Sequence, residues 1–133
     1  MLTYVSLFLA VSLGGLIGLE REKNNKDAGI RTVAMITLGA CMYSIISMKF
    51  PNADPTRVIA QIVTGIGFIG GGVIFRNNLS INGLTTAATI WGSAAVGVLC
   101  GVQEFVLALV GTALIVFLNI IHTNPKKFNH DNM

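Results

Sequence analysis

The chain has 133 residues, of which 53% are hydrophobic and only 11% are charged. Soluble domains average roughly 25% charged residues, so this composition excludes an ordinary soluble globule. The formal net charge of +3 lies in short loops between apolar runs rather than on one soluble face, which excludes a nucleic-acid-binding surface.

Charge-free windows divide the sequence, and each is close to the roughly 17 to 25 residues that a helix needs to cross a bilayer. They contain 19, 17, 18, 27 and 21 residues and run from Met1 to Leu19, Thr32 to Met48, Val58 to Phe75, Asn77 to Gln103, and Phe105 to Pro125. The sequence therefore predicts an all-α integral membrane domain over residues 1–123. The five predicted spans are 1–19, 32–48, 56–75, 84–101 and 105–122, followed by a short polar cytoplasmic tail, 124–133.

The basic residues indicate an orientation, because Lys and Arg concentrate in cytoplasmic loops. The first loop, the third loop and the tail share one side of a five-span bundle and contain seven basic residues, against two on the other side. We therefore expect the N-terminus outside the cell and the C-terminus in the cytoplasm.

The first span contains a glycine pair and ends in charges. Gly14 and Gly18 have i, i+4 spacing, which places two flat patches on one helix face and lets helix backbones approach closely in lipid. Glu20 and Arg21 follow at the predicted cytoplasmic boundary. Polar groups at the membrane edge are functional candidates, because their exposure to lipid is expensive.

The Glu20 carboxylate has two interpretations. It accepts a hydrogen bond from Arg31, at the start of the second span, or from Arg76, at the end of the third; alternatively, these charges form a solvated interfacial cluster. The second span offers only Gly39 and Ala40 as a small-residue patch. We therefore expect the second span to face lipid, while the first, third and fourth pack tightly.

A capping signal and a polar stripe mark the third span. Asp54 followed by Pro55 is typical of an N-cap and a first helical residue. Arg57, Gln61 and Thr64 then follow helical spacing and predict one polar stripe beside a glycine face. This stripe is either a helix interface hydrogen-bonded through Gln61 or part of a permeation path.

Glycine is concentrated in the second half of the third span. Gly65 and Gly67 precede the run Gly70 to Gly72, and Gly67 and Gly71 form another i, i+4 pair. Each glycine weakens a helix by roughly 1 kcal/mol relative to Ala. The run is therefore either a hinge or ion site within the span, or a surface for close packing.

The fourth span has polar groups at its start and small residues at its end. Arg76, before it, is expected at the C-terminus of the third helix, where the helix dipole favours a cation. Thr85 and Thr86 lie near a helix N-terminus, where they either help to bind an anion or simply cap the helix. Gly97 and Gly101 form the last i, i+4 pair.

The sequence contains no motif typical of catalysis, so we do not expect an enzyme. No acidic residue lies within a predicted span, and the metal site is left unassigned. Because Mg²⁺ is usually bound through one or two carboxylates, the spans offer no clear magnesium cage.

Four strings in order resemble the transmembrane domain of the MgtC/SapB family. They are GLERE at 18–22, AGIRT at 28–32, DPTRVIAQIVTGIGFIGGGVI at 54–74 and GLTTAATIW at 83–91. The resemblance implies a multi-pass protein of the bacterial inner membrane, associated with growth in low magnesium and, in pathogens, with survival inside host cells. Many members also have a cytoplasmic ACT-like domain after the spans, and we do not expect its activity from these residues.

Two function hypotheses follow. The first is a protein that contributes to magnesium-linked homeostasis or stress adaptation without a cofactor, through contacts with membrane lipids, further copies of itself in a homo-oligomer, or other inner-membrane proteins. The second is a transporter or channel for Mg²⁺ or another cation, formed by an oligomer around the third and fourth spans.

Overall fold

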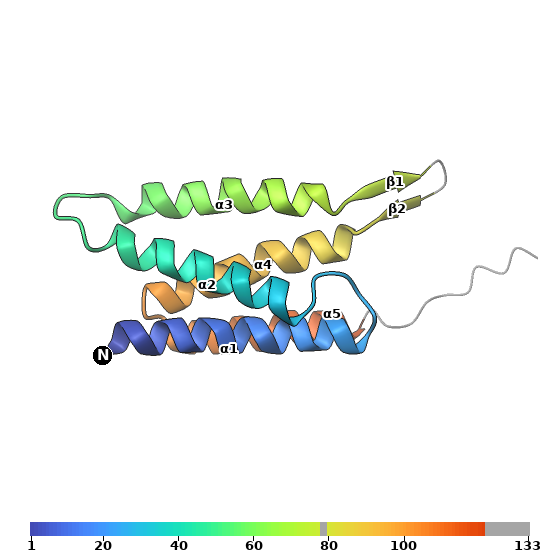
Figure 1. The fold of residues 1–133 in the computed structure, drawn as a ribbon, viewed down its shortest axis with the longest axis horizontal. Helices are drawn as coiled ribbons and strands as arrows, with labels where there is room; N and C mark the ends of the chain where they lie inside the picture. The colour runs from blue at the N-terminus through green and yellow to red at the C-terminus, as the bar shows by residue number, and fades with distance from the viewer. Residues whose placement is uncertain (78–79, 122–133) are drawn as a thin grey trace, which may run out of the picture.

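The computed structural model describes residues 1–77 and 80–121. Within these residues, helices run side by side along the long axis, and successive connections lie at opposite ends (Figure 1). They are α1 (Leu2–Lys23), α2 (Ile30–Ser47), α3 (Pro55–Gly72), α4 (Leu84–Gly101) and α5 (Phe105–Ile121). By length and composition, α1, α2 and α4 are apolar and long enough to cross a membrane, and α5 is a shorter apolar helix.

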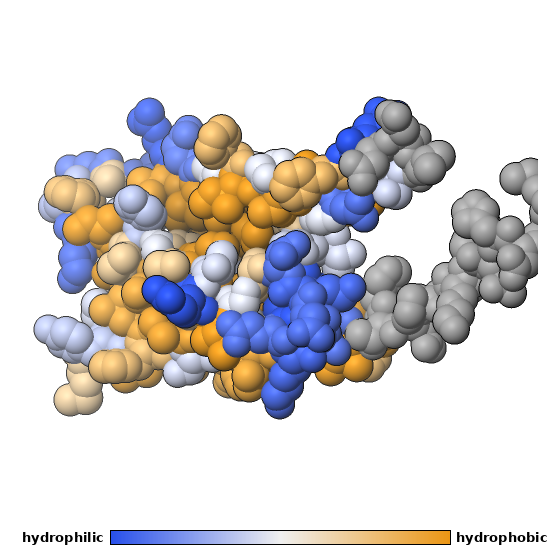
Figure 2. Space-filling view, turned by 45° about the vertical axis from the view of Figure 1, so that its right-hand side comes forward, coloured by the Kyte–Doolittle hydropathy of each residue, from blue (hydrophilic) through white to orange (hydrophobic). Residues whose placement is uncertain are grey.

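The helices follow the predicted spans closely. The largest difference is in α1, which continues past Leu19 to Lys23, while α3 ends at Gly72. The last residue of the fifth predicted span, 122, and the predicted tail, 124–133, lie outside the described residues. Apolar atoms cover much of the visible surface, and hydrophilic residues gather toward the ends of the helices (Figure 2).

A short β-hairpin joins α3 to α4. Strand β1 (Phe75–Asn77) pairs antiparallel with β2 (Ser80–Asn82), and Arg76 lies opposite Ile81. The expected place of Arg76 at a helix end is therefore wrong. Three poor helix-forming residues end α3 first, and the β-branched and aromatic residues that follow favour an extended chain.

Gly83 connects this hairpin to α4. Its φ of +83° lies in the left-handed region, which disfavours side chains. A Cβ there would also collide with the carbonyl oxygen of Val73. The glycine thus allows β2 to turn directly into the first residue of α4, Leu84.

Helix α2 packs against α1, α3 and α4. Its buried side chains include Thr37, Ala40 and Ser44, which are small or polar. The Thr37 hydroxyl donates a 2.7 Å hydrogen bond to the backbone oxygen of Ala10 in α1. The expectation that the second span faces lipid is therefore wrong, because small side chains other than glycine also permit close packing.

The glycine pairs of α1 and α4 both lie against α2. A Cβ on Gly18 would approach the Cα of Ile30 to 2.5 Å, and a Cβ on Gly14 would approach the Cα of Ala34 to 2.9 Å. On the other side, Gly97 and Gly101 contact the backbone of α2. The helices α1, α2 and α4 thus form the tightly packed core.

Helices α3 and α5 are the most loosely packed of the described helices. Only Ile66 and Gly70 are buried in α3. A Cβ on most of its glycines would have no neighbouring atom within 4 Å; these are Gly65, Gly67, Gly71 and Gly72. The expectation that the third span packs tightly is therefore wrong within a single chain, and its last glycines end the helix instead of interrupting it.

Candidate functional site

Two adjacent charged side chains are buried at the end of α1. Glu20 is 8% exposed and Arg21 is 2% exposed. Charged residues are almost never fully buried unless they are paired, so these two are the strongest candidates for a functional site. They lie at the end of the helix array that also contains the hairpin, which we call the hairpin end (Figure 1).

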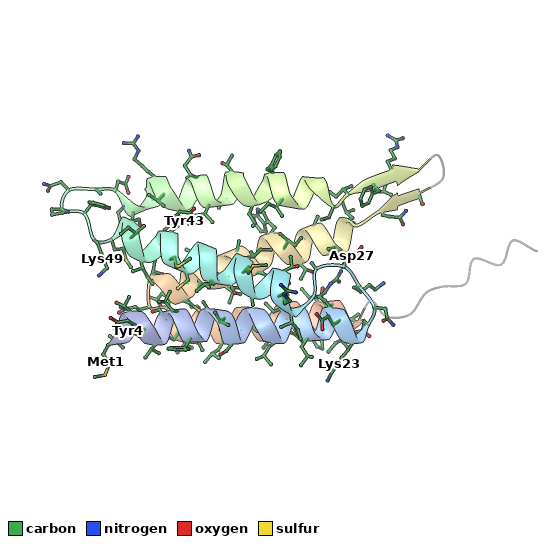
Figure 3. The ribbon with its side chains drawn as sticks, in the orientation of Figure 1. Met1, Tyr4, Lys23, Asp27, Tyr43 and Lys49 are labelled. Carbon is green, nitrogen blue, oxygen red and sulfur yellow. The ribbon has the colours of Figure 1, made fainter. Side chains whose placement is uncertain are left out.

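Arg21 links three segments of the chain. Its Nε donates a 3.3 Å hydrogen bond to the backbone oxygen of Asp27, in the loop after α1. Its Nη2 donates to the hydroxyl of Thr86 in α4. Figure 3 shows Lys23 at the end of α1 and Asp27 in the loop that follows it. One guanidinium therefore holds α1, the loop and α4 together.

Glu20 is paired on one oxygen only. Its Oε1 accepts a 2.8 Å hydrogen bond from the Nδ2 of Asn24, one turn later. Its Oε2 is buried and has no hydrogen-bond partner among residues 1–77 and 80–121. The expected bonds from Arg31 or Arg76 are absent from the described residues, and both arginines are exposed. The Oε2 of Glu20 can therefore still accept a hydrogen bond at the hairpin end.

The start of α4 is not capped by a threonine. Its N-cap is Gly83, with no side-chain capping bond, so the capping interpretation of Thr85 and Thr86 is wrong. Thr86 is buried and accepts from Arg21, whereas Thr85 is exposed. The helix start is therefore tied to α1 by a buried hydroxyl.

The sequence analysis missed a second polar contact, between α4 and α5. The hydroxyl of Thr89 lies 2.8 Å from the backbone oxygen of Thr85 and 3.1 Å from the Oδ1 of Asn119. The Nδ2 of Asn119 is buried and has no hydrogen-bond partner in the part of the chain that the structure describes. The signal that could have revealed it is Asn119 itself, an asparagine inside an apolar window.

The polar stripe of α3 lies outside the core. Arg57, Gln61 and Thr64 are all exposed, and the Thr64 hydroxyl bonds only to the backbone of its own helix, at Ala60. Asp54 is the N-cap and accepts from the backbone and hydroxyl of Thr56. The stripe is therefore neither buried by the rest of this chain nor enclosed as a path within it.

A groove with a volume of about 630 Å³ runs between α2 and α3, and we call it the α2–α3 groove. Its walls are almost entirely apolar, and Ala94 of α4 contributes to it. Gln61 and Tyr43 also line it, and Figure 3 shows Tyr43 on the side of α2 that faces α3. Among the described residues, no three His, Cys, Asp or Glu side chains gather to hold a metal ion.

Comparison with known proteins places this geometry in context. The sequence pattern of the MgtC family matches residues 7–128. Protein MgtC of Salmonella typhimurium (strain LT2) is 46% identical over 117 residues, which are 88% of this chain and 51% of that protein. Protein MgtC of Brucella abortus (strain 2308) is 47% identical over 113 residues, 84% of this chain and 48% of that protein.

The chain therefore spans about half the length of the curated relatives that it matches. No solved structure matches it.

Proposed function

The chain belongs to the MgtC family, and from this premise we propose that it contributes to magnesium-linked homeostasis or stress adaptation in the bacterial inner membrane. It acts there without catalysis, through contacts with lipids, with further copies of itself or with other membrane proteins. Because the relatives are about twice as long, the proposal concerns the part of the protein that these residues form.

A five-span arrangement is part of this proposal. Helices α3 and α5 lie alongside the three candidate spans (Figure 1). Large apolar side chains are exposed on both, for example Phe68 and Leu118. A bilayer would cover such side chains, whereas water would not, and this supports all five helices as membrane spans.

The charge distribution supports the N-terminus outside. Arg21 and the exposed Lys23, Lys26, Arg31 and Arg76 lie at the hairpin end, against Lys49 and Arg57 at the other. Since Lys and Arg accumulate on the cytoplasmic side, the hairpin end is the cytoplasmic one.

The exposed polar stripe of α3 is the observation that carries the interaction role. The buried polar groups, Arg21 and Thr86, are used to join helices at one end. In contrast, the side chains of Arg57 and Gln61 are exposed and make no hydrogen bond among the described residues, although the Arg57 charge interacts with that of Asp54. A membrane-embedded amide favours a hydrogen-bonded neighbour over hydrocarbon, so this face suits a partner.

Growth at limiting magnesium tests the proposed role. A strain that lacks this gene is expected to grow poorly at low Mg²⁺ and to recover with the wild-type chain but not with Arg21→Met. The Thr85→Val variant, altered at an exposed site next to Thr86, is expected to restore growth and serves as the control. Equal growth with and without the gene at every magnesium concentration would contradict the proposal.

A homo-oligomer is the second part of the proposal. The open glycines of α3 offer a flat surface to another copy. Replacing Gly67 and Gly71 together with Leu is expected to lower the particle mass measured by light scattering in detergent. An unchanged mass would exclude α3 as the contact face.

The alternative function is a cation transporter or channel built by the same oligomer. Several copies that meet through α3 would bring Gln61 and Thr64 around a common axis, and this arrangement favours the second hypothesis. It predicts a cation flux that depends on Gln61.

A further inference from the structure

The α2–α3 groove follows the helices for a distance that is significant in a bilayer. Its α3 wall extends from Val58 to Ile69, and its α2 wall from Tyr43 to Thr32. At 1.5 Å per residue, this part of α3 is about 17 Å long. That is more than half of the roughly 30 Å hydrocarbon thickness. The groove begins three residues after the first residue of α3 and ends three residues before the last, so it crosses the middle of the helix.

Nothing in the described chain fills this groove. Gly39 of α2 and Gly65 of α3 line it, and a Cβ on either would have no atom within 4 Å. Its walls are otherwise mainly apolar, with Ile62 and Ile66 on the α3 side. In a membrane, a lateral apolar groove is covered by hydrocarbon or by another protein segment.

The polar residues near the start of α3 follow a definite order with depth. Arg57 is exposed in the first turn of α3, one residue before the groove lining begins at Val58, and its charge interacts with that of Asp54. Gln61 lies one turn deeper, about 9 Å from Pro55 along the axis, and lines the groove. Only apolar residues of α3 follow along the wall, down to Ile69. This order corresponds to the parts of a phospholipid. The cation suits the phosphate, the amide suits an ester group, and the apolar wall suits an acyl chain.

We propose that the α2–α3 groove binds an acyl chain of a glycerophospholipid from the leaflet at the Pro55 end. The lipid phosphate lies at Arg57, and the Gln61 amide donates a hydrogen bond to an ester carbonyl. This inference rests on the proposed five-span arrangement, because α3 meets lipid only if it lies in the membrane. It assigns a lipid to this groove independently of any role in magnesium homeostasis.

Two open glycines of α3 provide a matched pair of variants. Gly65→Leu inserts a side chain into the groove, whereas Gly67→Leu adds the same side chain to an open position that does not line it. Gly39→Leu fills the groove from the opposite wall and keeps the test valid if Gly65→Leu fails to fold. Thermal unfolding of each detergent-solubilised variant identifies those that fold.

The full chain is incorporated into vesicles of phosphatidylglycerol that contain a photoactivatable group in one acyl chain, and the sites of cross-linking are mapped by mass spectrometry. We expect cross-links to groove residues in the wild type and several-fold fewer in Gly65→Leu and Gly39→Leu. Gly67→Leu is expected to keep the wild-type level of cross-linking. Equal cross-linking of the groove in wild type and both groove-filling variants would overturn the proposal. Protein–protein cross-links across the groove, in place of lipid, would show that a second copy fills it and would also overturn the proposal.

A pair of arginines tests the leaflet. Arg57→Gln is expected to reduce lipid cross-linking at the groove, and Arg31→Gln, an exposed arginine beside Thr32 at the hairpin end, is not. The reverse result would contradict the assigned leaflet. Failure of the chain to insert into the vesicles would instead contradict the five-span proposal, and a normal cross-link without any growth effect would contradict only the magnesium role.

Discussion

The buried guanidinium of Arg21 shows which part of the site sequence reasoning can reach. Arg21 and Thr86 were both candidates from their place at a predicted membrane edge. Their contact was not predictable, because 65 residues separate them and spacing along one helix says nothing about the neighbouring helix. By contrast, Glu20 was expected to meet an arginine and instead meets Asn24, four residues later at the end of the same helix, a contact that i, i+4 spacing could have indicated.

Removing the Thr86 hydroxyl leaves a buried N–H of Arg21 without its acceptor. Thr86→Val is therefore expected to destabilise the folded chain by about 1–3 kcal/mol. Thermal unfolding in detergent, followed by circular dichroism, measures the change. Thr85→Val is the control and is expected to have little effect, because Thr85 is exposed. Equal losses in both variants would show that the Arg21 contact does not contribute to stability.

Asp54 gives a pH-dependent prediction outside the membrane. Hydrogen bonds from the hydroxyl and backbone of Thr56 lower the pKa of its carboxyl below the ordinary value. A lowered folded-state pKa adds stability that is fully present above the unfolded-state pKa and is lost as the pH falls through the folded-state pKa.

Asp54→Asn is therefore expected to lower the melting temperature slightly near neutral pH. The difference from wild type should shrink as the pH falls below about 4, the ordinary range of an aspartate. Melting curves recorded from roughly pH 3 to pH 7, a range that includes the ordinary pKa of an aspartate, measure this difference in melting temperature. Glu104→Gln, altered at an exposed residue, is the control. A difference that grows on acidification would contradict the assigned sign.

At the scale of the elements, the sequence predicted the helices better than their packing. Asp54 and Pro55 mark the point where α3 begins, and charge-free windows locate all five helices because helix length and hydropathy are local properties. Glycine spacing marks a face but does not identify what lies against it. Thus the glycines of α1 and α4 contact α2, while those of α3 remain open.

This difference predicts opposite responses to the same substitution. Gly18→Leu would force a side chain against the backbone at Gly29 and Ile30, and overpacking of this kind costs about 1–3 kcal/mol or more. Gly67→Leu meets no atom within 4 Å in a single chain and is expected to leave its stability nearly unchanged. Unfolding in detergent at low protein concentration compares them. Similar losses would mean that α3 is packed in solution and that its face is already covered.

At the scale of the whole molecule, the arrangement predicts which loops face which side. A cysteine at Asn24, in the loop at the hairpin end, is expected to react with a membrane-impermeant maleimide only after the cells are opened. A cysteine at Asn52, between α2 and α3, is expected to react in intact cells. Cys41 and Cys100 are buried, so they add little background. The opposite labelling pattern would reverse the orientation.

We propose that this chain acts through contacts and does not itself conduct a cation. Purified protein in liposomes that enclose a Mg²⁺-sensitive dye tests it most directly, with protein-free liposomes and the Gln61→Leu variant in parallel. We expect external Mg²⁺ to enter all three kinds of liposome at the same slow rate. Rapid entry with the wild type that disappears with Gln61→Leu would contradict the account and establish the α3 stripe as a permeation path.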